Sequence, residues 1–249
     1  MNVKNMYAFY LSDSKKSLAV FYGIVVAVYM LFAIRVISAN GEDTINGMEI
    51  SSLIFIFILG LNLFKSNLQF GLTNGVSRRT QFISFTAAAA TLGVFMAAMD
   101  VIIEKLVNIF FSSSSLYLGI YGGRYSSFSA GLTLMDHIQM IAEQFLWCAF
   151  LYAAMAMLGF CINLIYYRSN TIMKYIVSVI PFIVVFVVEP YIERTTNGAF
   201  LHSISDFLSR AMGIGLTINP YIAMLSFFIG FGVLALCSYL LMRHAVIKQ

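Results

Sequence analysis

The stretch Phe64-Lys-Ser-Asn-Leu-Gln-Phe-Gly-Leu-Thr-Asn-Gly-Val-Ser-Arg-Arg-Thr-Gln-Phe82 separates two long apolar runs of the chain. It carries the basic residues Lys65, Arg78 and Arg79 and no acidic residue. The runs on either side, 48–64 and 81–105, are long enough to enter a bilayer, because about 20 apolar helical residues cross its hydrocarbon core. We call residues 64–82 the basic island, and its composition predicts a short loop between two membrane spans.

The composition of the whole chain predicts an integral membrane protein. Hydrophobic residues make up 60% of the 249 residues, charged residues make up 10%, and the mean hydropathy is +0.86. Soluble domains carry roughly 45–50% apolar and about 25% charged residues. Apolar runs recur from Leu18 to Met242 without a long polar or Pro-rich linker. We therefore expect residues 1–249 to form a single transmembrane domain.

The apolar runs predict an all-α integral membrane protein with six transmembrane helices. The expected spans are 18–37, 48–64, 81–105, 140–165, 172–188 and 221–242. Before the first span, Tyr7, Tyr10 and Leu11 share one helical face, which predicts a short N-terminal interfacial helix. Residues 112–134 are rich in Ser, Gly and Tyr, so we expect an irregular outer loop there.

Three local patterns add detail to these spans. The run of small residues Ala87–Gly93 predicts that a neighbouring helix approaches closely. Pro181 lies in the middle of the fifth span and predicts a kink, and we expect Glu189-Pro190 to end that span. An amphipathic outer segment is expected before the sixth span. Its apolar face consists of Phe200, Leu201, Ile204, Phe207, Leu208 and Ala211.

The distribution of charge predicts the orientation in the membrane. Ten of the 15 basic residues fall in the N-terminal segment, the basic island, the turn after the fourth span and the C-terminal tail, together with one acid, Asp13. The other side receives five basic and ten acidic residues. The chain is expected to cross the cell membrane several times. By the positive-inside rule, both termini and the basic island are expected on its cytoplasmic side. The net charge of +4 is then an orientation signal, and we expect no nucleic-acid partner.

Motifs of nucleotide, metal and hydrolase sites are missing from the sequence. It contains no Gly-x-x-x-x-Gly-Lys-[Ser/Thr], no His-Glu-x-x-His and no Gly-x-Ser-x-Gly. Cys148, Cys161 and Cys237 fall inside predicted spans, where thiols behave as small hydrophobic groups. We therefore expect no catalytic residue, metal or cofactor in this chain, and no enzymatic activity of its own.

Three acidic residues, Asp100, Glu104 and Glu143, are candidate pathway residues, because acids within spans commonly mark a transport route. Asp100 and Glu104 lie one helical turn apart and could meet Arg35 or Lys105 in a proton relay or an outer gate. In the alternative, which we favour, all three acids end helices at the outer interface, in water. An uncharged crossing on the inner side of each acid supports this alternative.

Several of these features together resemble an ABC-2 type transporter permease. They are the six-span layout, the amphipathic N-terminal helix, the outer amphipathic segment and the island sequence Phe70-Gly-Leu-Thr-Asn-Gly-Val-Ser-Arg-Arg-Thr-Gln-Phe82. The resemblance covers nearly the whole chain. It implies a coupling helix in the first cytoplasmic loop, a separate ATPase subunit that binds ATP and Mg, and two permeases around a central pathway. The ATPase-coupling residues implied are Gln69, Phe70, Gly71, Leu72, Asn74, Arg78 and Arg79.

We therefore expect the membrane subunit of a bacterial ATP-driven exporter, paired with a second copy or a similar paralogue. The few fixed charges favour a hydrophobic or amphipathic cargo, possible examples being a bacteriocin or a toxin peptide. A non-transporting immunity or assembly protein, which needs no ATPase, remains an alternative. A secondary transporter needs an ionisable group deep in the bilayer and is less favoured. The island itself is either a coupling element that ends near Asn74-Gly75 or a plain loop that sets topology.

Overall fold

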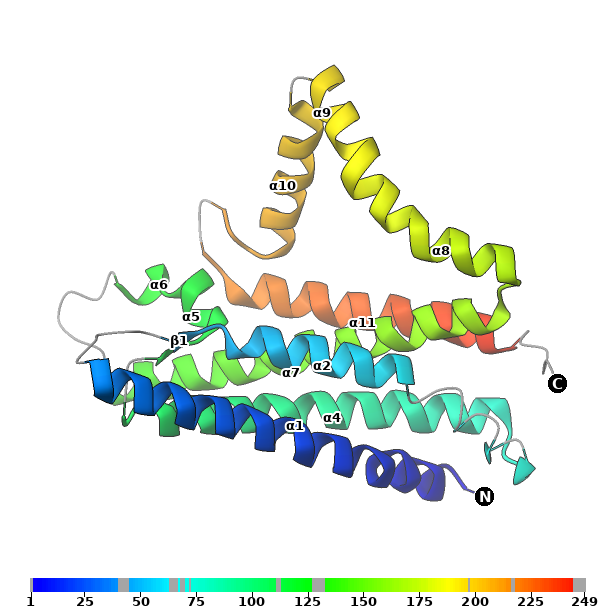
Figure 1. Cartoon of the computed structure of the whole chain (residues 1–249), viewed down its shortest axis with the longest axis horizontal. Coiled ribbons are helices and arrows are strands. Elements are labelled where there is room, and N and C mark those ends of the chain that lie inside the picture. Colours follow the sequence, from blue (N-terminus) through cyan, green and yellow to red (C-terminus); the bar gives the residue numbers. More distant parts are fainter. Residues whose placement is uncertain are drawn as a thin grey trace.

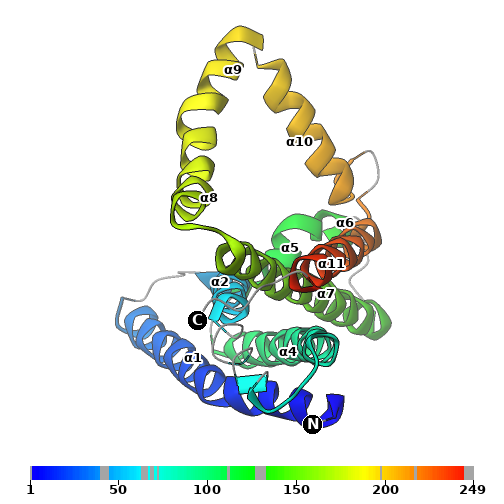
Figure 2. The same cartoon turned by 90° about the vertical axis from the view of Figure 1, so that its right-hand side faces the viewer.

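The computed structural model describes residues 2–39, 45–62, 67, 70–71, 73–110, 113–126, 133–196, 198–215 and 218–243. A bundle of long helices forms the body of the protein, and an arch of shorter helices stands away from it (Figures 1 and 2). The bundle helices are α1 (Val3–Ala39), α2 (Met48–Asn62), α4 (Arg78–Val107), α7 (Leu134–Arg168) and α11 (Pro220–Arg243). The central helix is α7, which packs along α2, α4 and α11, while α1 packs on α4.

Within the described residues, four helices are long and apolar enough to cross a membrane: residues 3–32 of α1, and all of α4, α7 and α11. Helix α2 is also apolar but has only 15 residues. The protein is therefore helical and carries several segments suited to a bilayer, as the apolar runs predict.

Close packing around α7 depends on small residues. A Cβ atom added at Gly93 would lie 2.8 Å from the Ala153 nitrogen, which confirms that the Ala87–Gly93 run lets a neighbouring helix approach closely. On the other side of α7, a Cβ atom added at Gly159 would lie 2.3 Å from the Phe57 carbonyl oxygen of α2. Helices α2 and α4 thus approach α7 closely, at contacts that leave no room for a side chain.

The N-terminal segment differs from the predicted interfacial helix, because residues 3–39 form one uninterrupted helix. Tyr10 is buried and packs edge-on against Phe85 of α4, with ring centroids 5.6 Å apart. The Ser14 hydroxyl donates to the Tyr10 carbonyl at 2.9 Å, so this polar group is satisfied inside the helix. No Pro or Gly precedes Gly23, and the helix therefore has no reason to break before the first span.

The described part of the predicted irregular loop is ordered, so that prediction is wrong there. Strand β2 (Ser113–Ser114) pairs in parallel with β1 (Ile45–Asn46), and the short helices α5 (Leu116–Tyr121) and α6 (Gly123–Ser126) follow. Ser115 caps α5 by accepting from the Leu118 nitrogen at 3.1 Å. Tyr117 and Tyr121 are fully buried, with ring centroids 6.1 and 6.3 Å from that of Trp147. This aromatic packing orders a segment whose composition indicates a loop.

The arch consists of α8 (Thr171–Ile183), a π-helical turn η1 (Val184–Val188), α9 (Glu189–Thr196) and α10 (Ala199–Ala211). The π-helical turn lies just after Pro181, which lacks a backbone donor, where the sequence predicts a kink. Glu189-Pro190 does not end the helical segment as expected, because α9 begins there and proline is tolerated in a first turn. The expected amphipathic segment forms α10, which has no buried residue and stands off the bundle (Figure 2).

Candidate functional site

Four buried acidic side chains belong to the parts of α2, α4 and α7 nearest α5 and α6, and Figure 1 shows these helix ends at one end of the bundle. The relative exposure is 4% for Glu49, 3% for Asp100, 5% for Glu104 and 2% for Glu143. The favoured expectation that Asp100, Glu104 and Glu143 end helices in water is therefore wrong. These residues lie on the faces of α4 and α7 that turn toward neighbouring elements, where polar partners replace water.

Glu143, near the start of α7, is surrounded by hydrogen-bond donors. The donors to its carboxylate are the hydroxyls of Tyr117 at 2.7 Å, Tyr125 at 2.6 Å and Tyr221 at 2.8 Å, Gln139 Nε2 at 2.8 Å and Arg124 Nη1 at 3.4 Å. The tyrosines belong to α5, α6 and α11. Glu143 therefore joins all three elements to α7 through charge-assisted hydrogen bonds.

The tyrosine donors on α5 and α6 hold their protons firmly. Burial and the hydrogen bond to Glu143 raise the pKa of Tyr125 to about 12. Burial and hydrogen bonds to Tyr125 and Glu143 also raise the pKa of Tyr117. Both phenols are therefore protonated donors at neutral pH. The Arg124 guanidinium supplies a positive charge and lies 6.0 Å from the centre of the Tyr221 ring.

Asp100 joins α4 to two other helices. Its carboxylate accepts from the Tyr152 hydroxyl of α7 at 2.6 Å and from the Tyr22 hydroxyl of α1 at 3.0 Å. The predicted partner Arg35 belongs to α1, but its side chain lies outside the described residues.

We expect Tyr152→Phe to lower the free energy of unfolding by about 1.5–3 kcal/mol, because it removes a short hydrogen bond to a buried carboxylate. Thermal unfolding of the purified protein in detergent measures this loss. Tyr175→Phe is the matched control, since Tyr175 is 69% exposed on α8. Equal stability of Tyr152→Phe and the control would contradict the role given to this hydrogen bond.

Glu49 and Glu104 complete the acidic group. Glu104 accepts from the side-chain amide of Gln144 and lies 3.5 Å from the Lys105 ammonium, one of its predicted partners. Glu49 accepts from the Leu116 nitrogen at 3.1 Å and so caps the start of α5. Glu49, Asp100 and Glu104 line one small cavity of about 10 Å³, which we call the acidic chamber. Its other lining residues are Tyr29, Met48, Ser113, Ser114 and Ser115.

The described residues of the basic island lie at the opposite end of the bundle, beside the start of α1 and the end of α11 (Figure 1). The structure therefore separates its described residues from the acidic residues rather than bringing them into one site. Phe70 stacks on Phe9 of α1, with ring centroids 4.7 Å apart, and Asn67 donates to Asp13 at 3.1 Å. Arg78 Nη1 lies 3.4 Å from the carbonyl oxygen of Arg243, at the end of α11.

The described part of the island has a helix end at the predicted place. Phe70, Gly71 and Thr73 are helical, and the Phe70 carbonyl accepts from the Asn74 side chain at 2.7 Å. Gly75 follows with φ of 70°, a left-handed conformation that glycine adopts without strain. Among the other expected coupling residues, Arg79 is exposed in the first turn of α4, and Gln69 and Leu72 lie outside the described residues.

The tyrosines that surround Glu143 were missed by the sequence analysis. Tyr117, Tyr121 and Tyr125 recur every four residues, which is a helical spacing that places three rings on one face. That spacing indicates an ordered aromatic face within the predicted loop. No comparable local signal indicates Tyr22, Tyr152 or Tyr221, because each lies in an apolar span of its own.

The chain was also compared with known proteins. No family model, no curated protein and no solved structure matches it. Within the described residues, no group of three or more His, Cys, Asp or Glu side chains is arranged to hold a metal ion.

Proposed function

We propose that this chain is the transmembrane subunit of an ATP-driven exporter of the ABC-2 type, powered by a separate cytoplasmic ATPase. The observation that carries the proposal is the position of the basic island, which contacts the start of α1 and the end of α11. A connection held by spanning helices can pass on a rigid-body displacement that a soluble partner applies to it. A subunit without its own nucleotide site needs such an input.

The arrangement of charge supports this orientation. The N-terminus, the described part of the basic island, the α7–α8 turn and the end of α11 lie at one end of the bundle (Figure 1). The buried acids lie at the other end. In the proposed topology the first end is cytoplasmic by the positive-inside rule, and α2 and α8–η1 are the second and fifth of six spans.

The arch supports the proposal of a paired permease. Its large apolar side chains are exposed, with 66% exposure for Phe182, 72% for Phe186 and 69% for Phe207. Exposed apolar faces of this extent mark surfaces for protein or lipid contact. In the proposed assembly, a second copy or a similar paralogue covers the arch, and the cargo pathway lies between the two permeases.

Affinity purification from native membranes tests the energy source. We expect a P-loop ATPase to co-purify with the tagged protein, and Arg78→Glu/Arg79→Glu to reduce its recovery roughly tenfold or more, because charge reversal places like charges in a docking surface. Lys15→Glu/Lys16→Glu is the matched control, since both lysines are exposed on α1 near the same end. Pairing of two permeases is tested by co-expressing two differently tagged copies of the chain and asking whether one copy co-purifies with the other.

Arg78 also contacts the end of α11, so reversing its charge also breaks a contact within the protein. The single variant Arg79→Glu leaves that contact in place and therefore tests the docking surface by itself. If a P-loop ATPase is absent in mild detergent, or if the control loses it equally, the proposed power input is wrong.

The buried acids favour a second candidate, an ion-coupled secondary transporter, because Asp100 and Glu104 are ionisable groups held away from water inside the bundle. Uptake of a candidate amphipathic peptide into inverted vesicles separates the two. An exporter requires ATP, whereas an ion-coupled transporter requires an ion gradient. A chain that moves no peptide under either condition fits the immunity-protein alternative.

A further inference from the structure

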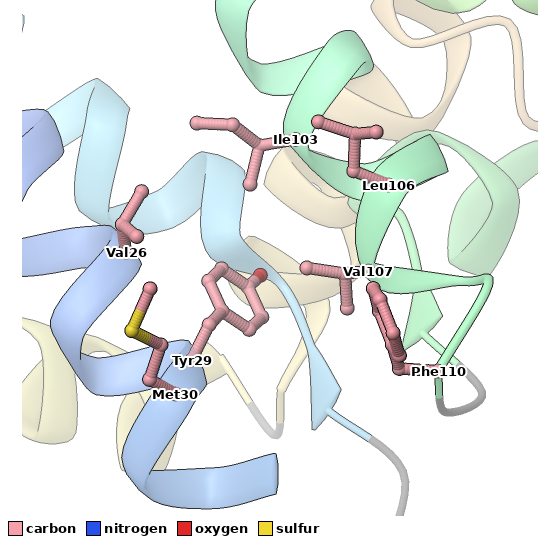
Figure 3. Close-up of a pocket in the computed structure, with 7 residues that line it drawn as sticks. All are labelled: Val26, Tyr29, Met30, Ile103, Leu106, Val107 and Phe110. Atoms are coloured by element: carbon pink, nitrogen blue, oxygen red, sulfur yellow. The ribbon is translucent and has the colours of Figure 1, made fainter.

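An apolar groove runs between α1 and α4 at the same end of the bundle as the acidic chamber. It has a volume of about 420 Å³, within the roughly 300–1,000 Å³ of small-molecule sites. Figure 3 shows side chains of the two helices facing each other across the groove, with Tyr29 between them. The lining residues are Val26, Tyr29, Met30, Ile103, Leu106, Val107 and Phe110. A surface of this composition accepts a hydrocarbon chain.

Tyr29 is the wall that the groove shares with the acidic chamber. Its ring lines the groove, and the same residue lines the chamber together with Glu49, Asp100 and Glu104. Its hydroxyl lies within electrostatic reach of all three carboxylates and interacts with Ser113. The Tyr29 side chain is therefore the boundary between the apolar groove and the acidic chamber.

The chamber is rich in hydrogen-bond acceptors and in negative charge. Three carboxylates face it. Among the described residues, the ion pair at the chamber joins Lys105 Nζ to Glu104 Oε1, 3.5 Å apart. Buried carboxylates without enough opposite charge are costly, and a cation placed among them removes that cost.

A buried amide oxygen beside these carboxylates has no hydrogen-bond partner in the described part of the chain. The Gln144 side chain points at Glu104, to which its nitrogen donates, while its Oε1 atom has no donor. The Ser52 hydroxyl is fully buried beside Asp100 and interacts with its carboxylate. The free Gln144 oxygen can accept from a donor placed beside Glu104.

The size of the chamber selects the cationic group. A cavity of about 10 Å³ holds roughly one water-sized group. A primary ammonium group has that size and carries three N–H donors. A trimethylammonium group is larger and has no N–H donor, and a phosphate group is larger and negatively charged.

We infer that groove and chamber together bind a single-chain primary amine, with its hydrocarbon chain between α1 and α4 and its ammonium group among Glu49, Asp100 and Glu104. Binding requires no ATPase and stands apart from the proposed transport. That such an amine is also the exported cargo, or the lysine-bearing part of it, rests on the proposed function.

Native mass spectrometry of the full-length protein in a mild non-ionic detergent tests this site, with dodecylamine as the probe. We expect a one-to-one adduct with dodecylamine at concentrations roughly tenfold lower than with dodecanol or dodecyltrimethylammonium, because only the primary amine gains charge-assisted hydrogen bonds. Equal affinity for dodecylamine and dodecanol would overturn the inference, and would mean that the acids are neutralised within the protein, by protons or by a basic side chain of the chain itself.

Variants separate the two halves of the site. Glu104→Gln keeps the shape of the side chain, and we expect it to weaken dodecylamine binding roughly tenfold while dodecanol binding is unchanged. Val26→Trp fills the groove and is expected to weaken both probes. Leu236→Trp is the matched control, because Leu236 is 60% exposed on α11, outside the groove. Unchanged dodecylamine binding by Glu104→Gln, or equal losses in Val26→Trp and Leu236→Trp, would contradict the assigned site.

Discussion

Glu143→Leu is expected to lower the free energy of unfolding by about 2–4 kcal/mol, because each hydrogen bond to a charged group contributes about 1.5–3 kcal/mol and the ion-pair partner Arg124 is only partly buried. The substitution leaves Arg124 and the tyrosine hydroxyls without the acceptor that they share. Leucine has a similar volume but no acceptor, so the loss arises from unpaired polar groups rather than from a cavity. Helices α5 and α6 then lose their main polar attachment to α7.

Two measurements follow this loss. Thermal unfolding in detergent reports stability, and the emission of Trp147, the only tryptophan, reports the packing of Tyr117 and Tyr121 against it. We expect a red shift in Glu143→Leu as water reaches this ring. Glu143→Gln is the matched control, because its amide oxygen still accepts from two tyrosines, and its cost is expected to be smaller. Wild-type stability of Glu143→Leu would show that the tyrosines find other acceptors.

Gly159→Val is expected to cost at least about 3 kcal/mol, or to prevent folding, because overpacking at a backbone contact cannot be relieved by a rotamer change. The added Cβ atom would lie 2.3 Å from the Phe57 carbonyl oxygen, so α2 has to move away from α7. The yield of monodisperse protein and its thermal unfolding measure the effect.

The matched control for this substitution is Gly230→Val on α11, where an added Cβ atom meets nothing within 4 Å. We expect its stability to stay within about 0.5 kcal/mol of the wild type. Gly159→Ala gives a graded version if the valine variant does not fold. Equal behaviour of the Gly159 and Gly230 variants would mean that α2 and α7 tolerate a wider separation.

Local patterns predicted the features that depend on neighbouring residues. Hydrophobic length located α4, α7 and α11, because burial in a bilayer needs only a long apolar run. Asn74-Gly75 predicted a helix end, because glycine adopts a positive φ without strain. Ala87–Gly93 predicted close helix packing for the same local reason, the absence of large side chains.

The environment of the acids depends on partners that are distant in the sequence, and this is why it could not be predicted. Tyr22 lies 78 positions before Asp100, and Tyr221 lies 78 positions after Glu143. Each acid considered alone is most simply placed in water, whereas the folded chain surrounds it with hydroxyl, amide or ammonium donors. The continuity of α1 was missed for a related reason. Its polar N-terminal turns are stabilised by packing against α4 rather than by their own composition.

The unbroken α1 helix has a mechanical consequence. It contacts the basic island at Phe9, hydrogen-bonds to Asp100 at Tyr22 and lines both groove and chamber at Tyr29. At a rise of about 1.5 Å per residue, roughly 20 Å of helix separates Phe9 from Tyr22 and roughly 10 Å separates Tyr22 from Tyr29. Helix α1 also contacts α4 between Phe9 and Tyr22, through Tyr10 and Phe85, so it joins these places as one continuous helix. In the proposed topology, a displacement applied at the cytoplasmic end of α1 therefore reaches Tyr29 without a break in the helix between them.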